Sequence, residues 1–304
     1  MPLKSLLTRW LMSNPNPQSE PSPKNPLLDR MKERVEKSGK YYWGQTWKGI
    51  DVLPDGKPVL DPSRGEDYGS FWGDVAKTRE GALMVTRQMI IDEETDTFIS
   101  EDVADMIHRV LHLTPDSRVL EVGSGTGSLA VSIAPKVKSY ALADISASML
   151  EHARKRLEGI AGTSFHHLAR CDLREFPDNH FDGVLFEAVM GHMDREDSYR
   201  YMLETYRVLK PGGRAYFQFF NLLHPQGFAE FEHTVEKHCD GRGRNLISRT
   251  RFHTPVEARS YVTHAGFLID EECSQLSDLP GETLLHINEH ALVAVCRKPQ
   301  EGHR

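Results

Sequence analysis

From about residue 100 onward, short apolar runs alternate with segments of helical periodicity, and this alternation constrains the fold more than any other feature. Alternation at this spacing is typical of parallel strands joined by crossover helices. The runs expected to form strands are 118–122, 138–144, 165–169, 181–187, 214–220, 267–271 and 291–297. The expected helices are 128–134, 147–157, 198–209 and 256–264.

The two ends of this alternating region are also readable. A helix is expected to start at Ser100, where a capping hydroxyl precedes two acids, so the main domain would cover 100–298. The last two strands are joined by 272–289, which has no strong helical pattern, so we expect an antiparallel hairpin at one sheet edge. The stretch 221–253 is expected to be an insertion, and it is one of two candidates for a lid over the site, the other being the aromatic segment 41–75.

The first hundred residues differ in composition from the rest of the chain. We expect 1–26 to be a flexible segment with a Pro-rich linker, and 27–99 to be a helical and aromatic cap. Within the cap, 27–40 and 76–91 are expected as helices and 41–75 as an irregular segment. Large rings in such a segment either pack on the main domain or hold a substrate by stacking, and the candidates are Trp43, Trp47 and Trp72.

The overall composition limits the classes of partner. The 304 residues carry 37 Lys and Arg against 44 Asp and Glu, a net charge of −7, so we expect no nucleic-acid partner. No apolar run approaches the roughly 20 residues that span a bilayer, so no membrane span is expected. The four cysteines are not arranged as metal ligands or as a disulfide framework, which fits a cytoplasmic location and no metal site.

The strongest local motif is a glycine-rich turn that follows the first expected strand. Glu121 lies near the end of that strand, and Gly123, Gly125 and Gly127 follow before a helix begins. Glycines let the chain turn sharply and let a ligand lie against bare backbone. A nicotinamide or flavin site would favour G-x-G-x-x-G, but the sixth position from Gly123 is Ser128.

Polar residues at the ends of the next two strands fit a nucleoside. Asp144 ends the second strand and can accept both ribose hydroxyls, although it could instead cap the following helix. Ile145 could pack on the adenine face. After the third strand, Asp172 could accept a hydrogen bond from an adenine amino group, and the N–H of Leu173 could read a ring nitrogen, although an Asp in a loop is usually a turn residue.

Together with Phe181-Asp182 and Leu209-Lys-Pro-Gly-Gly213, these motifs resemble the class I S-adenosylmethionine-dependent methyltransferases, and in detail their ubiquinone/menaquinone-type small-molecule branch. The resemblance covers roughly 100–298. It implies an α/β, Rossmann-like, seven-stranded and mostly parallel sheet of order 3-2-1-4-5-7-6, with strand 7 antiparallel. It also implies S-adenosyl-L-methionine as the cofactor and in-line methyl transfer to a small-molecule substrate.

The same resemblance assigns further residues to the cofactor. The methionine part would lie against Glu121, Gly123, Gly125 and Gly127, and the sulfonium would lie near Glu187 and Ala188 after the fourth strand. If the acceptor must lose a proton, His192 is the candidate base, because it follows that strand at the carboxyl edge. A structural histidine bonded to backbone is the alternative.

Three other functions are compatible with parts of the sequence. A protein or RNA methyltransferase would carry an N/D-P-P-Y/F motif after the fourth strand, where Glu187-Ala-Val-Met190 stands instead. A regulatory protein that binds the cofactor without turnover would keep the glycine turn and Asp144. A nicotinamide oxidoreductase would bind NAD rather than S-adenosylhomocysteine, and calorimetry would distinguish the two.

Overall fold

The computed structural model of this chain describes residues 67–87, 93–238, 249–272, 274 and 291–300. The helix expected at 27–40, Trp43, Trp47 and most of the connection 272–289 lie outside these ranges. The strands are β1 (Arg118–Val122), β2 (Ser139–Asp144), β3 (Thr163–His167), β4 (Phe181–Phe186), β5 (Leu209–Asn221), β6 (Phe252–His253), β7 (Leu268–Ile269) and β8 (Ala291–Arg297). The helices are α3 (Tyr68–Val75), α4 (Arg79–Arg87), α5 (Glu93–Val110), α6 (Ser128–Ile133), α7 (Ala147–Arg156), α8 (Arg195–Val208), α9 (Pro225–His238) and α10 (Pro255–His264), with 3-10 turns η2 (Ala134–Lys136) and η3 (Met190–His192).

The strands form one mixed sheet of order β3-β2-β1-β4-β5-β8-β7. Because β7 and β8 are the sixth and seventh expected strands, this is the predicted order, with β8 antiparallel to both of its neighbours. The difference is β6, which adds a short parallel pairing at Phe220 and Asn221, the carboxyl end of β5. The predicted Rossmann-like sheet and edge hairpin are therefore confirmed, with one additional strand.

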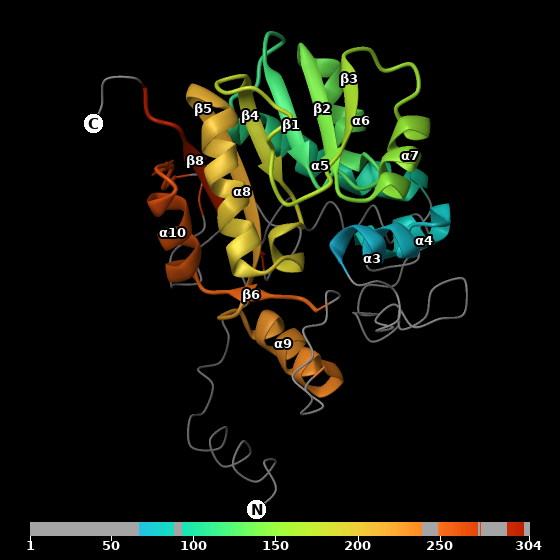
Figure 1. The fold of residues 1–304 in the computed structure, drawn as a ribbon, viewed down its shortest axis with the longest axis vertical. Helices are drawn as coiled ribbons and strands as arrows, with labels where there is room; N and C mark the ends of the chain where they lie inside the picture. The colour runs from blue at the N-terminus through green and yellow to red at the C-terminus, as the bar shows by residue number, and fades with distance from the viewer. Residues whose placement is uncertain (1–66, 88–92, 239–248, 273, 275–290, 301–304) are drawn as a thin grey trace, which may run out of the picture.

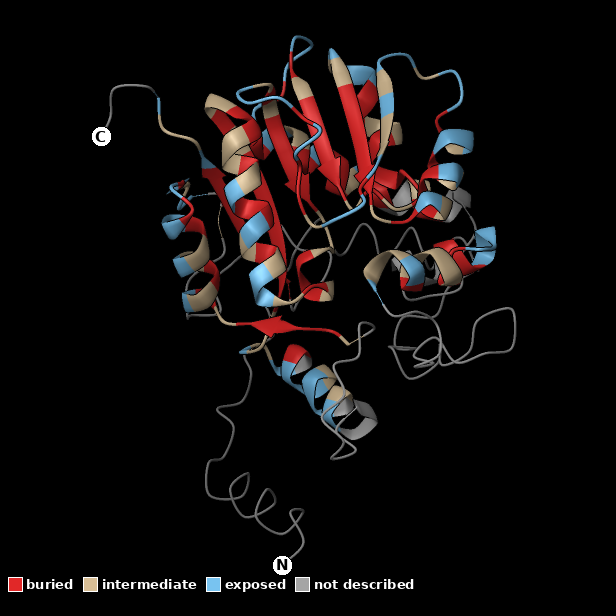
Figure 2. Cartoon of the chain, viewed as in Figure 1, coloured by how far each residue is buried: buried red, intermediate tan, exposed pale blue. Residues whose placement is uncertain are grey.

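Helices cover both faces of the sheet (Figure 1). Alternate residues of each central strand point to opposite faces, so Leu120 of β1 packs with α8 and α10, whereas Val119 packs with α5, α6 and α7. Figure 2 shows the central strands as almost continuously buried. Burial on both faces explains why these segments read as apolar runs rather than as an alternating pattern.

The parallel register brings several strand ends together at one edge. Glu121 of β1 pairs with Leu142 of β2 and with Leu185 of β4, so the residues that follow these strands leave the sheet side by side. The parallel strands β1, β2 and β4 end toward α3 and β6 in the lower half of Figure 1. This carboxyl edge is where ligands bind in open α/β sheets.

Two expectations for the region before β1 are wrong. Tyr68–Val75 forms helix α3 rather than an irregular segment, because Asp67 caps it: the Asp67 carboxylate accepts from the Ser70 N–H at 2.8 Å. Ser100 does not start a helix, since α5 already begins at Glu93. The Ser100 hydroxyl donates instead to the carbonyl of Asp96 at 2.6 Å inside that helix. The expected domain boundary at 99/100 therefore cuts through α5.

The expected insertion 221–253 contains α9 and β6. Helix α9 lies beyond the carboxyl edge and exposes an apolar stripe of Phe228, Phe231 and Val235. Within the described ranges, no helix is both long enough and apolar enough to cross a membrane.

Candidate active site

The glycine-rich turn after β1 depends on its glycines. Gly123, Gly125 and Gly127 have φ values of 71°, 53° and 77°, in the left-handed region that other residues adopt at a cost. A Cβ on Gly123 would lie 2.3 Å from Val189 Cγ2, and one on Gly127 would lie 3.0 Å from Leu157 Cδ1. The turn therefore cannot accept side chains at these positions without moving its neighbours.

Asp144 at the end of β2 is in direct contact with this turn. Its Oδ2 accepts from the Gly125 N–H at 2.8 Å, and its Oδ1 accepts from the Ser146 N–H at 2.8 Å. Burial raises the pKa of Asp144 to about 6, and these two hydrogen bonds oppose the shift. The carboxylate is therefore mostly ionised at pH 7, and each oxygen keeps a second lone pair for a ligand hydroxyl.

The alternative that Asp144 merely caps α7 does not hold. The cap of α7 is Ser146, whose hydroxyl oxygen accepts from the Met149 N–H at 3.2 Å. The neighbouring Ile145 lies beneath α3, where a Cβ on Gly69 would come within 3.2 Å of the Ile145 carbonyl oxygen. Helix α3 thus covers the carboxyl end of β2.

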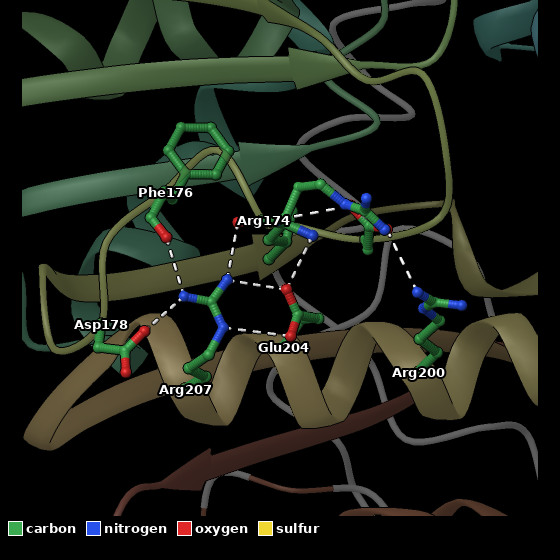
Figure 3. A network of polar contacts seen from close by, with 8 residues as sticks. Arg174, Phe176, Asp178, Arg200, Glu204 and Arg207 are labelled. Carbon is green, nitrogen blue, oxygen red and sulfur yellow. Dashed lines mark hydrogen bonds and ion pairs between the residues drawn. The ribbon is translucent and has the colours of Figure 1, made fainter.

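The loop after β3 carries a dense ion-pair network (Figure 3). Asp172 accepts from Arg174 Nη2 at 2.6 Å and from Arg200 Nη2 at 3.3 Å, and the hydrogen bonds from Arg174 hold its pKa below the usual value. The N–H of Leu173 donates to Glu204 Oε2 at 3.1 Å, and its carbonyl accepts from Arg207 Nη2 at 2.8 Å.

Both predicted adenine contacts therefore already have protein partners. Glu204 and Arg207 lie one turn apart on α8, and Arg207 also donates to the Phe176 carbonyl at 2.9 Å, so α8 fixes the loop from one side. A ligand would have to displace Glu204 to reach the Leu173 N–H. We conclude that Leu173 is poorly placed for this role, whereas Asp172 can share its carboxylate oxygens.

Two carboxylates lie near the carboxyl ends of β1 and β4: the buried Glu121 and the partly buried Glu187. Glu121 Oε2 accepts from the Tyr140 hydroxyl at 2.9 Å. Glu187 contacts the Tyr216 hydroxyl, and burial beside this carboxylate raises the pKa of Tyr216. Glu121 is the penultimate residue of β1, and Glu187 is the first residue after β4, the strand that pairs with β1.

Ala188 has a strained backbone. Its φ of 56° is unusual for a residue other than glycine, and its N–H donates to the buried Gln218 Oε1 at 2.7 Å. Such strain persists where surrounding contacts enforce it, and it is frequent at functional sites. The structure thus puts Ala188 at the carboxyl edge in a conformation held from β5.

His192 lies in η3 between two rings. The centroid of its ring is 5.0 Å from that of Trp72 and 5.9 Å from that of Phe220. Burial, together with the nearby charge of Arg251, lowers the pKa of His192 to about 4. His192 is therefore neutral at pH 7 and able to accept a hydrogen bond.

Two residues that the sequence analysis did not assign hold this loop in place. The N–H of Arg251 donates to the Gly191 carbonyl at 2.7 Å, and its guanidinium Nε donates to Asp194 Oδ1 at 3.0 Å. The Tyr68 hydroxyl accepts from the Asp194 N–H at 2.9 Å and donates to Asp197 Oδ2 at 3.2 Å. The capping pattern at Asp67 was a readable signal for α3, whereas no sequence signal links Arg251 to η3.

Comparison with known proteins gives a consistent result. Residues 119–213 match a family described as a methyltransferase domain. A ubiquinone/menaquinone biosynthesis C-methyltransferase from Ectopseudomonas mendocina is 42% identical over 106 residues, which is 33% of this chain and 40% of that protein. The corresponding protein of Psychromonas ingrahamii is 36% identical over 130 residues, 38% of this chain and 51% of that protein. The chain thus spans about half or less of the length of these relatives.

Solved structures agree at the level of the fold. A Bacillus halodurans protein described as a methyltransferase superposes with a TM-score of 0.50 at 20% identity, covering 65% of this chain and 99% of that one. A chain from the complex of a Haloferax volcanii methyltransferase activator with a methyltransferase gives 0.50 at 17% identity, covering 68% and 95%.

Proposed function

We propose that this chain, which carries a class I S-adenosylmethionine-dependent methyltransferase domain, transfers the cofactor's methyl group to a small-molecule acceptor. The observation that carries the proposal is the 2.8 Å hydrogen bond between the Gly125 N–H and Asp144. It joins a turn of bare backbone to an ionised carboxylate, the two features that an adenosyl ligand requires.

The residues at this edge fit the cofactor. Close packing of Val189 against Gly123 leaves no room for a side chain on the turn. The Ser124 hydroxyl oxygen is buried without a hydrogen-bond partner among the residues that the structure describes, so a polar ligand group can use it. We name Gly123, Gly125, Gly127 and Asp144 the donor end, and we propose that it holds the methionine and ribose parts.

The neighbouring region is proposed to hold the acceptor. We name Tyr68, Trp72, His192 and Arg251 the acceptor end. Tyr68 and Trp72 lie in α3, His192 lies in η3, and Arg251 directly precedes β6. Trp72 packs edge-on against His192, so it orients that ring rather than offering an open stacking face there. Trp43 and Trp47, outside the described residues, stay substrate-binding candidates from the sequence.

The bound cofactor would supply a methyl group that is already activated for displacement. The chain's task is then to align the two reactants and to exclude water, and positioning alone can contribute roughly 7–11 kcal/mol. Helix α3 serves both purposes in our proposal, because Tyr68 binds the loop after β4 while Gly69 packs on Ile145 after β2.

His192 is proposed to accept the hydrogen bond, or the proton, of the acceptor. A pKa of about 4 keeps the ring unprotonated at neutral pH but makes it a weak base in the free protein. This suits an acceptor whose proton becomes acidic only as the methyl group arrives. The relatives named as C-methyltransferases make electron-rich carbon acceptors the first class to test.

Calorimetry with S-adenosylhomocysteine tests the donor end, and methyl release with a panel of carbon, oxygen, nitrogen and sulfur acceptors tests turnover. We expect Asp144→Ala to weaken nucleoside affinity by on the order of 100-fold, because charge-assisted hydrogen bonds to two hydroxyls are lost. The matched control is Asp116→Ala, at an exposed position in the turn before β1.

Unchanged affinity in the Asp144 variant would overturn the proposal, as would binding of NAD without binding of the nucleoside. Binding of the nucleoside with no methyl release from any acceptor class would favour the regulatory alternative.

A further inference from the structure

A buried ion pair lies against the end of the glycine-rich turn. Asp96 of α5 accepts from Arg156 Nη1 at 2.5 Å, and the side chains are 0% and 4% exposed. The Arg156 Nη2 also donates to the Thr97 hydroxyl at 2.6 Å. Two charges buried this deeply are retained only when further hydrogen bonds satisfy them.

Those further hydrogen bonds lead into the turn. Arg156 Nη1 donates to the hydroxyls of Thr126 at 3.2 Å and Ser128 at 3.4 Å, the residues on either side of Gly127. The Ser128 hydroxyl in turn donates to Asp96 Oδ2 at 2.8 Å. The ion pair therefore hydrogen-bonds to side chains at two positions of the turn, Thr126 and Ser128. The backbone at Gly127, between them, packs against the side chain of Leu157.

Helix α7 connects the ion pair to Asp144, the carboxylate proposed to bind the ribose. Its first turn begins at Ser146, whose N–H donates to Asp144, and its last residue is Arg156. Asp144 then returns to the turn through the Gly125 N–H. The turn, the carboxylate and α7 thus form a closed ring of contacts, and Asp96 ties that ring to α5.

We propose that Arg156 and Asp96 are positioning residues that hold the glycine turn in its ligand-binding conformation. The hydrogen bonds described above join them to each other, to Thr97 of α5 and to the two residues that flank Gly127. The inference rests on the proposed function only in identifying the ligand. It also explains why residues before 119, outside the matched methyltransferase domain, would contribute to cofactor affinity.

The test compares full-length variants with and without ligand. Arg156→Met removes the charge and all the donors, Arg156→Lys keeps the charge, and Thr126→Val with Ser128→Ala removes the link to the turn while leaving the ion pair. The matched control is Lys136→Met, which breaks the exposed pair with Asp105 on the same helix α5. All are measured well below their unfolding temperatures.

Hydrogen exchange of the 123–130 segment in the ligand-free protein is the first readout. We expect faster exchange there in Arg156→Met and in the double variant, with central strands such as β4 unchanged, and no effect in the control. The second readout is affinity for S-adenosylhomocysteine, which should fall between about 10- and 100-fold, since misplacing a binding group has effects of this size. Arg156→Lys should recover part of both.

The two readouts separate the inference from the proposed function. If the wild-type chain does not bind the nucleoside, the proposed function fails, while exchange in the turn still tests the ion pair. Exchange that rises uniformly over the whole chain, or a turn unaffected in the double variant, overturns the positioning role. If Arg156→Met does not fold, the double variant alone decides.

Discussion

The donor end and the acceptor end lie at the same sheet edge but are built differently. The donor end takes its residues from 22 consecutive positions, Gly123 to Asp144, and its central contact is a backbone N–H on a carboxylate. The acceptor end joins Tyr68, His192 and Arg251, which are far apart in the sequence and are linked through long-range hydrogen bonds of side chains and backbone to the loop after β4. A ligand shared by many proteins can be bound by a local motif, whereas the contacts around a particular acceptor are distributed over the fold.

The two ends also differ in charge, although burial acts on both. Burial raises the pKa of Asp144 to about 6 and lowers that of His192 to about 4, since it penalises the charged form of each group. At pH 7 the donor end is therefore anionic and the acceptor-end ring is neutral. This difference matches the roles proposed for them, one holding hydroxyl donors and the other accepting a proton.

The largest effect on cofactor affinity should come from adding a side chain to a glycine of the donor end. Gly123→Ala puts a Cβ 2.3 Å from Val189 at a φ of 71°, so the turn must move. We expect affinity for S-adenosylhomocysteine to fall by more than about 100-fold in calorimetry. Gly159→Ala is the matched control, because Gly159 has a φ of 85° and open space around its Cβ. Equal losses in both variants would mean that backbone strain alone, not the shape of the donor end, is responsible.

The acceptor end should respond in turnover rather than in cofactor affinity. We expect His192→Asn to lower kcat by on the order of 100-fold for acceptors that lose a proton, because a general base typically contributes that much. Affinity for S-adenosylhomocysteine should stay within about twofold. His264→Asn, at an exposed position on α10, is the control. A parallel loss of cofactor affinity would contradict the division of the site into two ends.

A pH series should distinguish the ends further. Since the Asp144 carboxyl is protonated below its pKa of about 6, nucleoside affinity should be constant above that pH. Below it, affinity should fall by up to about tenfold per pH unit. Turnover at saturating cofactor should fall only nearer pH 4, where His192 gains its proton. If affinity and turnover fell over the same pH range, one titrating group would control both, and the two ends would not be independent.

The smallest expected effect concerns the attachment of α3. Tyr68→Phe removes one acceptor and one donor at 2.9 and 3.2 Å, so we expect the free energy of unfolding to fall by about 1 kcal/mol. Urea denaturation measures it, and a double-mutant cycle with Asp197→Ala isolates the hydroxyl contact. A coupling energy of zero would show that the contact with Asp197 contributes nothing, which leaves the hydrogen bond from the Asp194 N–H and packing to hold α3.

Much of the fold could be predicted because the central strands are continuous apolar runs. The bounds of β1 and β8 match the prediction residue for residue, and the sheet order follows from the family motifs. Strand β3 was expected two residues too late, at 165–169 rather than Thr163–His167, because it lies at the edge and its residues are only partly buried. Edge strands lack the apolar pattern that fixes register.

The candidate site could be predicted only where it is local. The contact between Asp144 and the glycine turn follows from adjacent strand ends, and the structure has it at 2.8 Å. The hydrogen bond from the Leu173 N–H to Glu204 depends on which face of α8 packs against the loop. The ion pair between Arg156 and Asp96 joins residues that are 60 positions apart in the sequence. Neither pattern leaves a signal in local spacing.

The ring formed by the turn, Asp144 and α7 has a consequence for the kinetics of ligand capture. Because these contacts already order the turn in the ligand-free protein, the turn loses little conformational entropy when a ligand binds. Ligand association should then need no slow rearrangement of the turn. Differences in affinity would therefore come from the dissociation rate rather than from the association rate. Slow product departure would follow from the same rigidity, so departure of the spent nucleoside is a natural candidate for the step that limits each cycle.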